Sequence, residues 1–168
     1  MSEQVQAEGK ASEVTIVSLP EMIMVGFPVN VSFKEGVFSN IGLTKQRFMD
    51  NKAAIKHAVD PDTYWAPWYN CEVMFTYFYC LEVSELADIP EGMMGFTIPA
   101  ASYATVRYEG PLPWSQPDPY GLLAEYRRDK GIESYENGMV LEKYRFDNDC
   151  APNEYTAIEV FGPVKAEA

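Results

Sequence analysis

Histidine, cysteine and basic side chains are scarce in this chain of 168 residues. Its single histidine, His57, lies beside Lys56 on the polar side of a predicted helix, so a Ser-His-Asp or Cys-His system has no plausible base. The three cysteines, Cys71, Cys80 and Cys150, lack CxxC or Cys/His spacing, which argues against a disulfide framework and a metal site. P-loop, GxGxxG and HExxH motifs are absent as well, and we expect no cofactor.

Long apolar runs are also missing, both near 18 residues and as an N-terminal signal-like region, which argues against membrane spanning and secretion. Together with the cysteine usage, this favours a cytoplasmic protein. Only 13 basic residues stand against 25 acidic ones, giving a formal charge of −12. Direct nucleic-acid binding needs a clustered basic face and is disfavoured. The negative field attracts cations, although the same charge also serves solubility alone.

Apolar alternation and turn residues divide the chain into two similar halves, which we expect at 13–84 and 93–165. Residues 1–12 have no periodicity and are expected to form a disordered leader. Each half reads β-α-β-β. The predicted strands span 14–19, 22–33, 64–70 and 72–82, then 93–98, 102–108, 140–146 and 155–164.

One predicted helix lies in each half. The first carries an apolar stripe of Ile41, Phe48, Ile55 and Val59, is capped by Asn40 or Thr44, and ends before Pro61. The second begins at Pro119 and is closed by Gly131, with Tyr120, Leu123, Tyr126 and Arg127 near one side. Two such units, packed with pseudo-two-fold symmetry, predict an α+β fold with a ligand groove where the halves meet.

Several short motifs occur in the order and spacing of one known family. They are Phe75-Thr-Tyr-Phe-Tyr-Cys-Leu-Glu-Val-Ser, Ile89-Pro-Glu-Gly-Met, Thr97-Ile-Pro-Ala-Ala-Ser-Tyr-Ala-Thr-Val, Gly110-Pro, Leu141-Glu-Lys-Tyr and Ile158-Glu-Val-Phe-Gly-Pro-Val-Lys. Over about residues 13–165 the chain resembles the gyrase-inhibitor-like (GyrI-like) small-molecule-binding family. That family includes effector-binding domains of bacterial multidrug-sensing transcription activators and stand-alone relatives on mobile gene cassettes such as integrons.

The resemblance implies a duplicated β-α-β-β fold, with an antiparallel sheet enclosing a deep cavity and helices packed outside. The cavity is expected to accept lipophilic, often cationic, aromatic compounds. Two positions depart from the family pattern, with Cys80 in place of glycine and Gly162 in place of an apolar residue. Only about a dozen unpatterned residues precede the domain, where the family's activators carry a helix-turn-helix module, so we do not expect operator binding by this chain alone.

Glu142 is the residue on which we expect selectivity to depend. It alternates with the apolar residues Val140, Tyr144 and Phe146 on one face of a predicted strand, an unusual place for an acid. A carboxylate among aromatic rings lacks a counter-charge that an organic cation supplies. By the resemblance, Glu142 matches an acid at the bottom of the family's cavity, and Glu159 and Phe161 match a second acid and its neighbouring aromatic residue.

Aromatic residues are expected to form the remaining walls, with core or surface packing as the alternative for each. Trp68, together with Trp65 and Tyr69, lies on the strand of the first half that corresponds to the Glu142 strand, and we expect these residues to form the opposite wall of the groove. Hydroxyl groups in the wall are expected from Tyr77 and Tyr103. Tyr144, which shares a face with Glu142, is expected at the ligand site as well. A lid is expected at the mouth of the second helix, from Trp114 and Tyr120.

These residues favour a binding protein over an enzyme. The main hypothesis is a stand-alone effector-binding or multidrug-binding module that captures lipophilic cationic small molecules. One alternative is a hydrolase that uses Glu142 and Glu159 as acid and base, as some stand-alone family members do with Trp and Glu residues. Another is a regulatory protein whose ligand-bound form docks on a DNA-binding partner or on gyrase.

Overall fold

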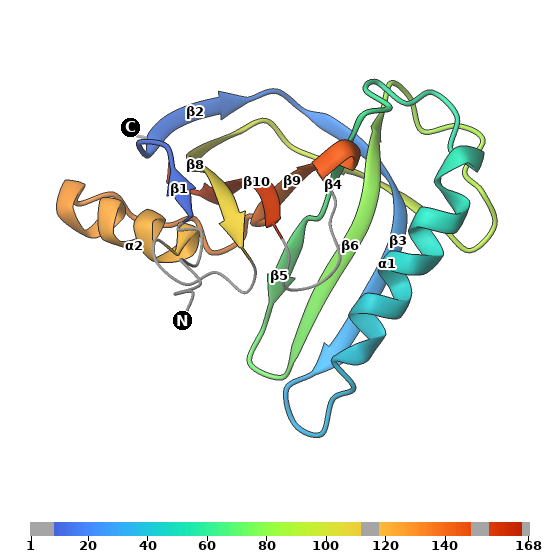
Figure 1. The fold of residues 1–168 in the computed structure, drawn as a ribbon, viewed down its shortest axis with the longest axis horizontal. Coiled ribbons are helices and arrows are strands. Elements are labelled where there is room, and N and C mark those ends of the chain that lie inside the picture. The colour runs from blue at the N-terminus through green and yellow to red at the C-terminus, as the bar shows by residue number, and fades with distance from the viewer. Residues whose placement is uncertain (1–8, 112–117, 149–154, 166–168) are drawn as a thin grey trace, which may run out of the picture.

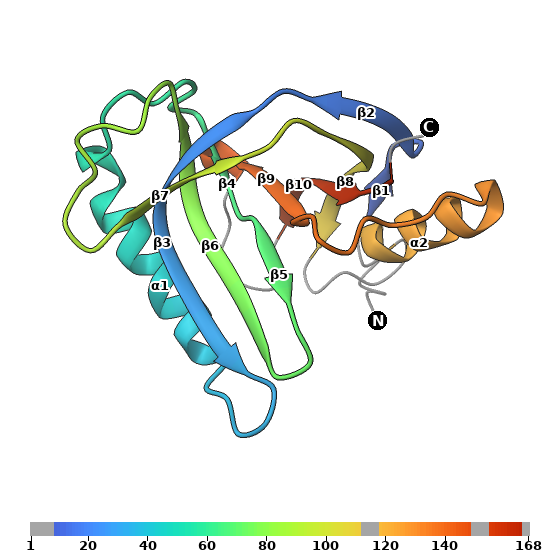
Figure 2. The ribbon, with the colours of Figure 1, turned by 180° about the vertical axis from the view of Figure 1, so that it is seen from behind.

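A computed structural model describes residues 9–111, 118–148 and 155–165 of the chain. It shows a largely antiparallel ten-stranded sheet with two α-helices, which confirms the predicted α+β class (Figures 1 and 2). Both helices pack on one face of the sheet and lie towards opposite ends of the molecule. No helix among the described residues is long and apolar enough to cross a membrane.

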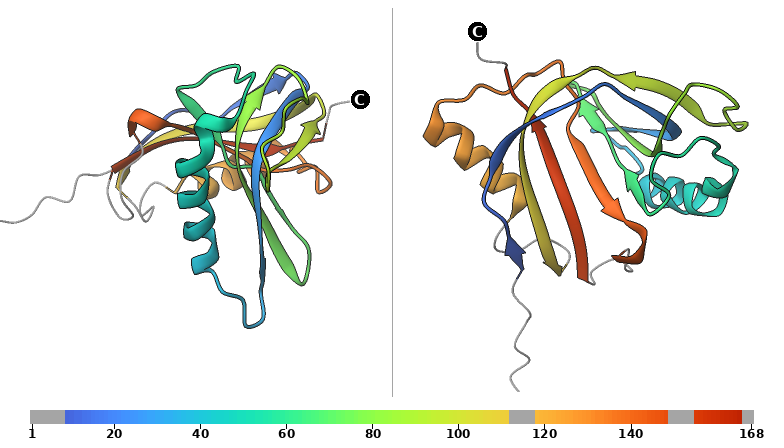
Figure 3. Two further views of the ribbon diagram at one scale, coloured as in Figure 1. Left: turned by 90° about the vertical axis from the view of Figure 1, so that its right-hand side faces the viewer. Right: turned by 90° about the horizontal axis from the view of Figure 1, so that it is seen from above.

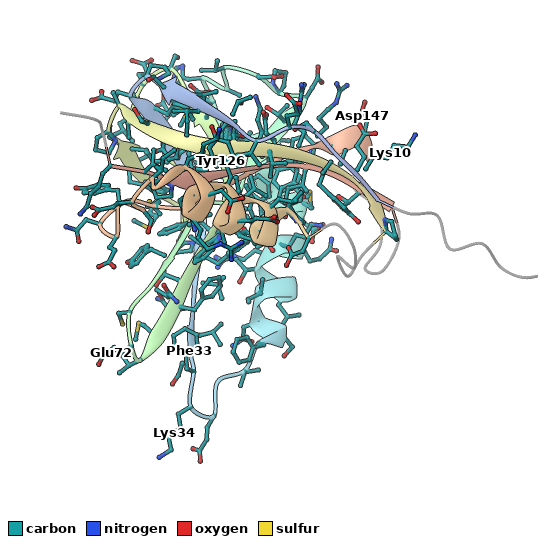
Figure 4. The ribbon with its side chains drawn as sticks, turned by 90° about the vertical axis from the view of Figure 1, so that its left-hand side faces the viewer. Lys10, Phe33, Lys34, Glu72, Tyr126 and Asp147 are labelled. Atoms are coloured by element: carbon teal, nitrogen blue, oxygen red, sulfur yellow. The ribbon has the colours of Figure 1, made fainter. Side chains whose placement is uncertain are left out.

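The first half follows the predicted β-α-β-β order, but the strand predicted over 64–70 is divided into two short strands. Its elements are β2 (Thr15–Leu19), β3 (Met22–Ser32), α1 (Ser39–Asn51), the 3-10 helix η1 (Lys52–Ala54), β4 (Thr63–Trp65), β5 (Trp68–Asn70) and β6 (Met74–Val83). The connections at the far end of β3 and β6, which carry Phe33, Lys34 and Glu72, form a protruding tip (Figure 4).

The second half repeats this order with elements of similar length. They are β7 (Met94–Ile98), β8 (Ala101–Pro111), α2 (Pro119–Lys130), β9 (Leu141–Arg145), the 3-10 helix η2 (Phe146–Asn148) and β10 (Tyr155–Pro163). Strands β2 and β7 both have 5 residues, and β3 and β8 both have 11. This correspondence is the structural signature of the duplication that the sequence pattern predicts.

Each half lends its first strand to the sheet of the other half. The order is β1-β8-β10-β9-β4-β6-β3-β7, with β2 also paired to β8 and β5 to β6. Thus β2 extends the second half, whereas β7 extends the first (Figure 3). The two half-sheets join directly at the centre, where β4 pairs with β9.

Three boundaries differ from the sequence-based expectation. The sheet begins at β1 (Lys10–Ala11), a strand that pairs with β8 although it falls within residues 1–12, where a disordered leader was expected. Residues 1–8 lie outside the described residues. Helix α1 begins after Phe38 with no side-chain cap, while the hydroxyl of Thr44 donates to the Asn40 carbonyl within the helix, at 2.8 Å. Neither expected residue therefore caps it.

The first helix also ends earlier than its apolar stripe predicts. Phe48 and Ile55 are buried as expected, but Val59 is 55% exposed. The chain leaves helical geometry at Ile55, which is extended with φ −74° and ψ 119°. At His57 it then adopts a φ of 66°, a left-handed conformation that a helix does not accommodate. His57 is consequently not on a helix; its ring contacts the carboxylates of Asp88 and Glu85 at 3.0 and 3.4 Å. In the second half, Pro119 opens α2 and Gly131 closes it, as predicted.

Candidate ligand-binding site

The carboxylate of Glu142 lies at the centre of the sheet, on the face that carries both helices. β9 joins the other half through reciprocal backbone hydrogen bonds: the Ala66 amide donates to the Glu142 carbonyl at 2.7 Å, and the Glu142 amide donates back at 3.2 Å. Because opposed residues in an antiparallel pair share a face, Ala66 and Val160 flank Glu142 on either side. Glu142 is only 5% exposed.

Three tyrosine hydroxyls donate to this carboxylate. Tyr77 from β6 and Tyr144 from β9 both donate to Oε1, the latter at 2.7 Å. Tyr120 from the first turn of α2 donates to Oε2. The Tyr120 hydroxyl in turn accepts a hydrogen bond from Trp68 Nε1 at 3.0 Å. Both halves of the fold therefore contribute donors to one carboxylate.

Burial dominates the electrostatics of the site. It raises the pKa of the Glu142 carboxyl, and the hydrogen bonds from the tyrosines oppose that rise only in part. Burial, followed by the neighbouring Glu142 charge, also raises the pKa of Tyr77, Tyr120 and Tyr144. The hydroxyls therefore stay protonated and act as donors, which leaves the site negative whenever Glu142 is ionised.

A continuous series of aromatic rings runs from the carboxylate along the first half. Trp68 lies 5.4 Å from Phe75, Phe75 lies 5.7 Å from Tyr77, and Tyr77 lies 5.1 Å from Tyr79, measured between ring centroids. These residues share a face because they alternate along β6 or lie opposite it on β5. Such rings offer negatively polarised faces to a cation.

A pocket of about 260 Å³ adjoins this site on the side of α2. Trp68 and Tyr120 form its boundary towards Glu142, and Val140, which directly precedes β9 and bridges to Trp68, also lines it. Its outer wall includes Tyr135, which is exposed, and its far end includes Arg127 of α2. The pocket therefore reaches from solvent to the hydrogen-bonded Trp68–Tyr120 pair that covers the carboxylate.

The structure brings together five of the nine residues expected at the ligand site. These are Glu142, Trp68, Tyr77, Tyr120 and Tyr144. Trp114 lies outside the described residues.

Glu159, Phe161 and Tyr103 lie on the opposite face of the sheet, and their expected grouping with Glu142 is corrected. Glu159 is opposed by Lys143 and Arg107 rather than by Glu142, because the register pairs Val160 with Glu142. The Phe161 ring packs 6.2 Å from Tyr103 in a separate core cluster that also contains Trp65. The two glutamates therefore cannot act on one compound as an acid and base pair.

Arg127 is one of the pocket residues to which the sequence analysis assigns no role. The sequence pattern places it only near one side of the second helix, yet it lines the same pocket as Tyr120. The signal was available, because residues seven apart on a helix lie on nearly the same side.

Comparisons with known proteins give one consistent result. Residues 15–164 match the family model Cass2, the integron-associated effector binding protein. The transcriptional regulator BrlR of Pseudomonas aeruginosa is 27% identical over 154 residues, which are 89% of this chain and 54% of BrlR. The chain thus spans about half the length of that relative.

Solved structures share the fold. SAV2435, in a structure bound to tetraphenylphosphonium, has a TM-score of 0.69 and 16% identity, with 92% of this chain and 94% of that chain covered. The EcmrR C-terminal domain has a TM-score of 0.66 and 19% identity, covering 91% and 97%. An integron cassette protein from the mobile metagenome of Vibrio cholerae has a TM-score of 0.61 and 13% identity, covering 95% and 100%.

Proposed function

Since the chain belongs to the family of integron-associated effector-binding proteins, we propose that its Glu142 site binds lipophilic, cationic, aromatic small molecules. The observation that carries this proposal is a buried carboxylate whose hydrogen-bond partners are tyrosine hydroxyls. Within the described part of the chain, no lysine or arginine forms an ion pair with Glu142. The tyrosine hydroxyls thus stabilise the negative charge of Glu142, but no positively charged side chain neutralises it among the described residues.

The energetics favour a cation that is itself poorly hydrated. Ionising a buried carboxylate is costly, and an organic cation next to it offsets that cost. A lipophilic cation loses little hydration on entering, and each ring face adds about 0.5–2 kcal/mol. Selectivity then follows from charge and planarity, so that many scaffolds are accepted.

The ligand approaches through the pocket beside α2. Trp68 and Tyr120 line that pocket, and Tyr120 also contacts the carboxylate. We propose that a bound aromatic ring packs against Trp68 while the Tyr120 hydroxyl yields its bond to Glu142. The tetraphenylphosphonium bound to the structural relative SAV2435 supports this ligand class.

A regulatory output is the second part of the proposal. BrlR is a transcriptional regulator, and the match to this chain covers 54% of it. We propose that the ligand-bound domain acts on transcription through a DNA-binding partner rather than by contacting DNA itself, in keeping with the net charge of −12.

A titration with tetraphenylphosphonium, followed by tryptophan fluorescence, tests the binding proposal. We expect saturable binding to the unmodified protein and at least about tenfold weaker binding to Glu142→Gln, since removing one partner of a buried charge pair costs this much or more. Glu125→Gln, which removes an exposed charge from α2, is the matched control and should bind normally. The proposal is wrong if no saturable binding occurs or if Glu142→Gln binds as tightly as the unmodified protein.

A further inference from the structure

The far end of the ligand pocket carries a positive charge. Arg127 and Tyr120 both line it and lie seven residues apart on α2, which corresponds to an axial separation of about 10 Å. Tyr120 marks the end nearest the Glu142 carboxylate. Arg127 therefore lies at one end of the pocket, and the Glu142 carboxylate, which does not itself line the pocket, lies behind Tyr120 at the other end. The axial separation of Tyr120 and Arg127 is roughly the length of a two- or three-ring compound.

The absence of a side chain at Gly162 makes room for the Arg127 guanidinium. Gly162 is buried on β10, and a Cβ atom there would lie 3.1 Å from Nη1 of Arg127 and 3.7 Å from Cδ1 of Leu123. The first distance is tighter than an ordinary van der Waals contact, so a larger residue would push the guanidinium away.

The guanidinium has no acidic partner within the part of the chain that the structure describes. None of the described ion pairs or side-chain hydrogen bonds involves it. Glu136 lines the same pocket, but it is exposed and forms no ion pair with Arg127 among the described residues. The next residue, Arg128, differs in both respects: its side chain is 75% exposed and lies 3.7 Å from Asp129.

We propose that this pocket selects amphoteric aromatic compounds, which present a cationic group towards Glu142 and an acidic group to Arg127. The planar guanidinium fork matches a carboxylate through two parallel hydrogen bonds, and partial burial strengthens that contact. This inference rests on the proposed function, because the cationic end of the ligand is assigned to Glu142. It adds a second charge requirement that a simple lipophilic cation does not meet.

Two dyes that differ only in one acidic group test the inference. Rhodamine 110 carries a free carboxylate on a cationic xanthylium ring system, and rhodamine 123 is its methyl ester. We expect fluorescence anisotropy to show rhodamine 110 binding about tenfold more tightly than rhodamine 123. In Arg127→Gln this preference should disappear, whereas Arg128→Gln, which removes the same charge from an exposed neighbour, should retain it.

The arms of the experiment separate the two claims. If rhodamine 123 binds in a Glu142-dependent manner but rhodamine 110 binds no better, the amphoteric requirement is wrong and the cation site stands. The same conclusion follows if Arg127→Gln retains the preference and its thermal unfolding shows it to be folded. If neither dye binds, both claims fail together. Gly162→Val provides a second route, since it displaces the guanidinium without removing its charge, and it should also reduce the preference.

Discussion

The two helix-covered cores of this duplicated fold are built from different side chains. Beneath α1 the core combines aliphatic side chains with five aromatic rings, which come from both the sheet and the helix: Phe27, Phe48, Tyr64, Tyr77 and Tyr79. Beneath α2 it is mainly aliphatic: Ala104, Val106, Leu123, Ile158 and Val160. Equivalent backbones therefore carry unlike chemistry. Glu142 lies where they meet, with polarisable rings on one side and saturated side chains on the other, so a ligand reaching it meets ring faces mainly from the first half.

The largest expected effect comes from removing one central side chain from each core. Phe48→Ala is expected to lower the free energy of unfolding by about 3–5 kcal/mol, because it removes a fully buried ring. The centroid of that ring lies within 6.4 Å of the ring centroids of Tyr64, Tyr79 and Phe146. Leu123→Ala should cost less, about 2–3 kcal/mol. Urea denaturation measures both. Equal losses of unfolding free energy in the two variants would mean that the rings give the core beneath α1 no extra stability.

The charge at the junction of the cores predicts two opposite pH dependences. Because burial raises the folded-state pKa of Glu142, the unmodified protein should lose stability relative to Glu142→Gln as pH rises through that raised pKa, and regain it on acidification. Cation affinity should change in the other direction, falling up to about tenfold per pH unit below the raised pKa, since protons compete with the ligand.

Denaturation and tetraphenylphosphonium titration across the acidic range measure these slopes. Glu142→Gln is the reference for both, because it cannot titrate at this position. Cation affinity that stays constant down to the ordinary carboxyl range would show that Glu142 does not carry the charge that attracts the ligand.

A smaller effect is expected at Trp68, where two substitutions distinguish the contribution of the ring from that of its N–H group. Trp68→Phe keeps an aromatic surface in the first half but removes the donor to Tyr120, so it should cost about 0.5–1.5 kcal/mol of unfolding free energy. Trp68→Ala removes both and should weaken tetraphenylphosphonium binding more than Trp68→Phe does. Equal losses of affinity would place the contribution in the hydrogen bond rather than in the ring.

The sequence predicted the features that depend on local periodicity. Alternation along β9 indicated that Glu142 shares a face with apolar residues, and the structure shows it buried there. Proline and glycine signals located both ends of α2. The duplicated order of elements was also readable, because strand and helix periods differ clearly.

The features that the sequence did not predict correctly depend on strand register and on tertiary contacts. Period-two alternation shows which residues of one strand share a face, but not which face of a neighbouring strand aligns with it. A pairing shifted by one residue would have brought Glu159, rather than Val160, opposite Glu142. Similarly, the relation between Gly162 and Arg127 requires knowing that β10 lies beneath α2.

The exchange of first strands between the halves, β2 onto β8 and β7 onto β3, ties the folding of the two repeats together. Neither repeat is a complete unit, because each one on its own would lack an edge strand and expose the backbone that this strand covers. The domain should therefore unfold in a single cooperative transition. The exchange also requires pairing between residues far apart in the chain, for which folding is intrinsically slow. Two repeats of one order of elements thus form a single domain that cannot be divided between them.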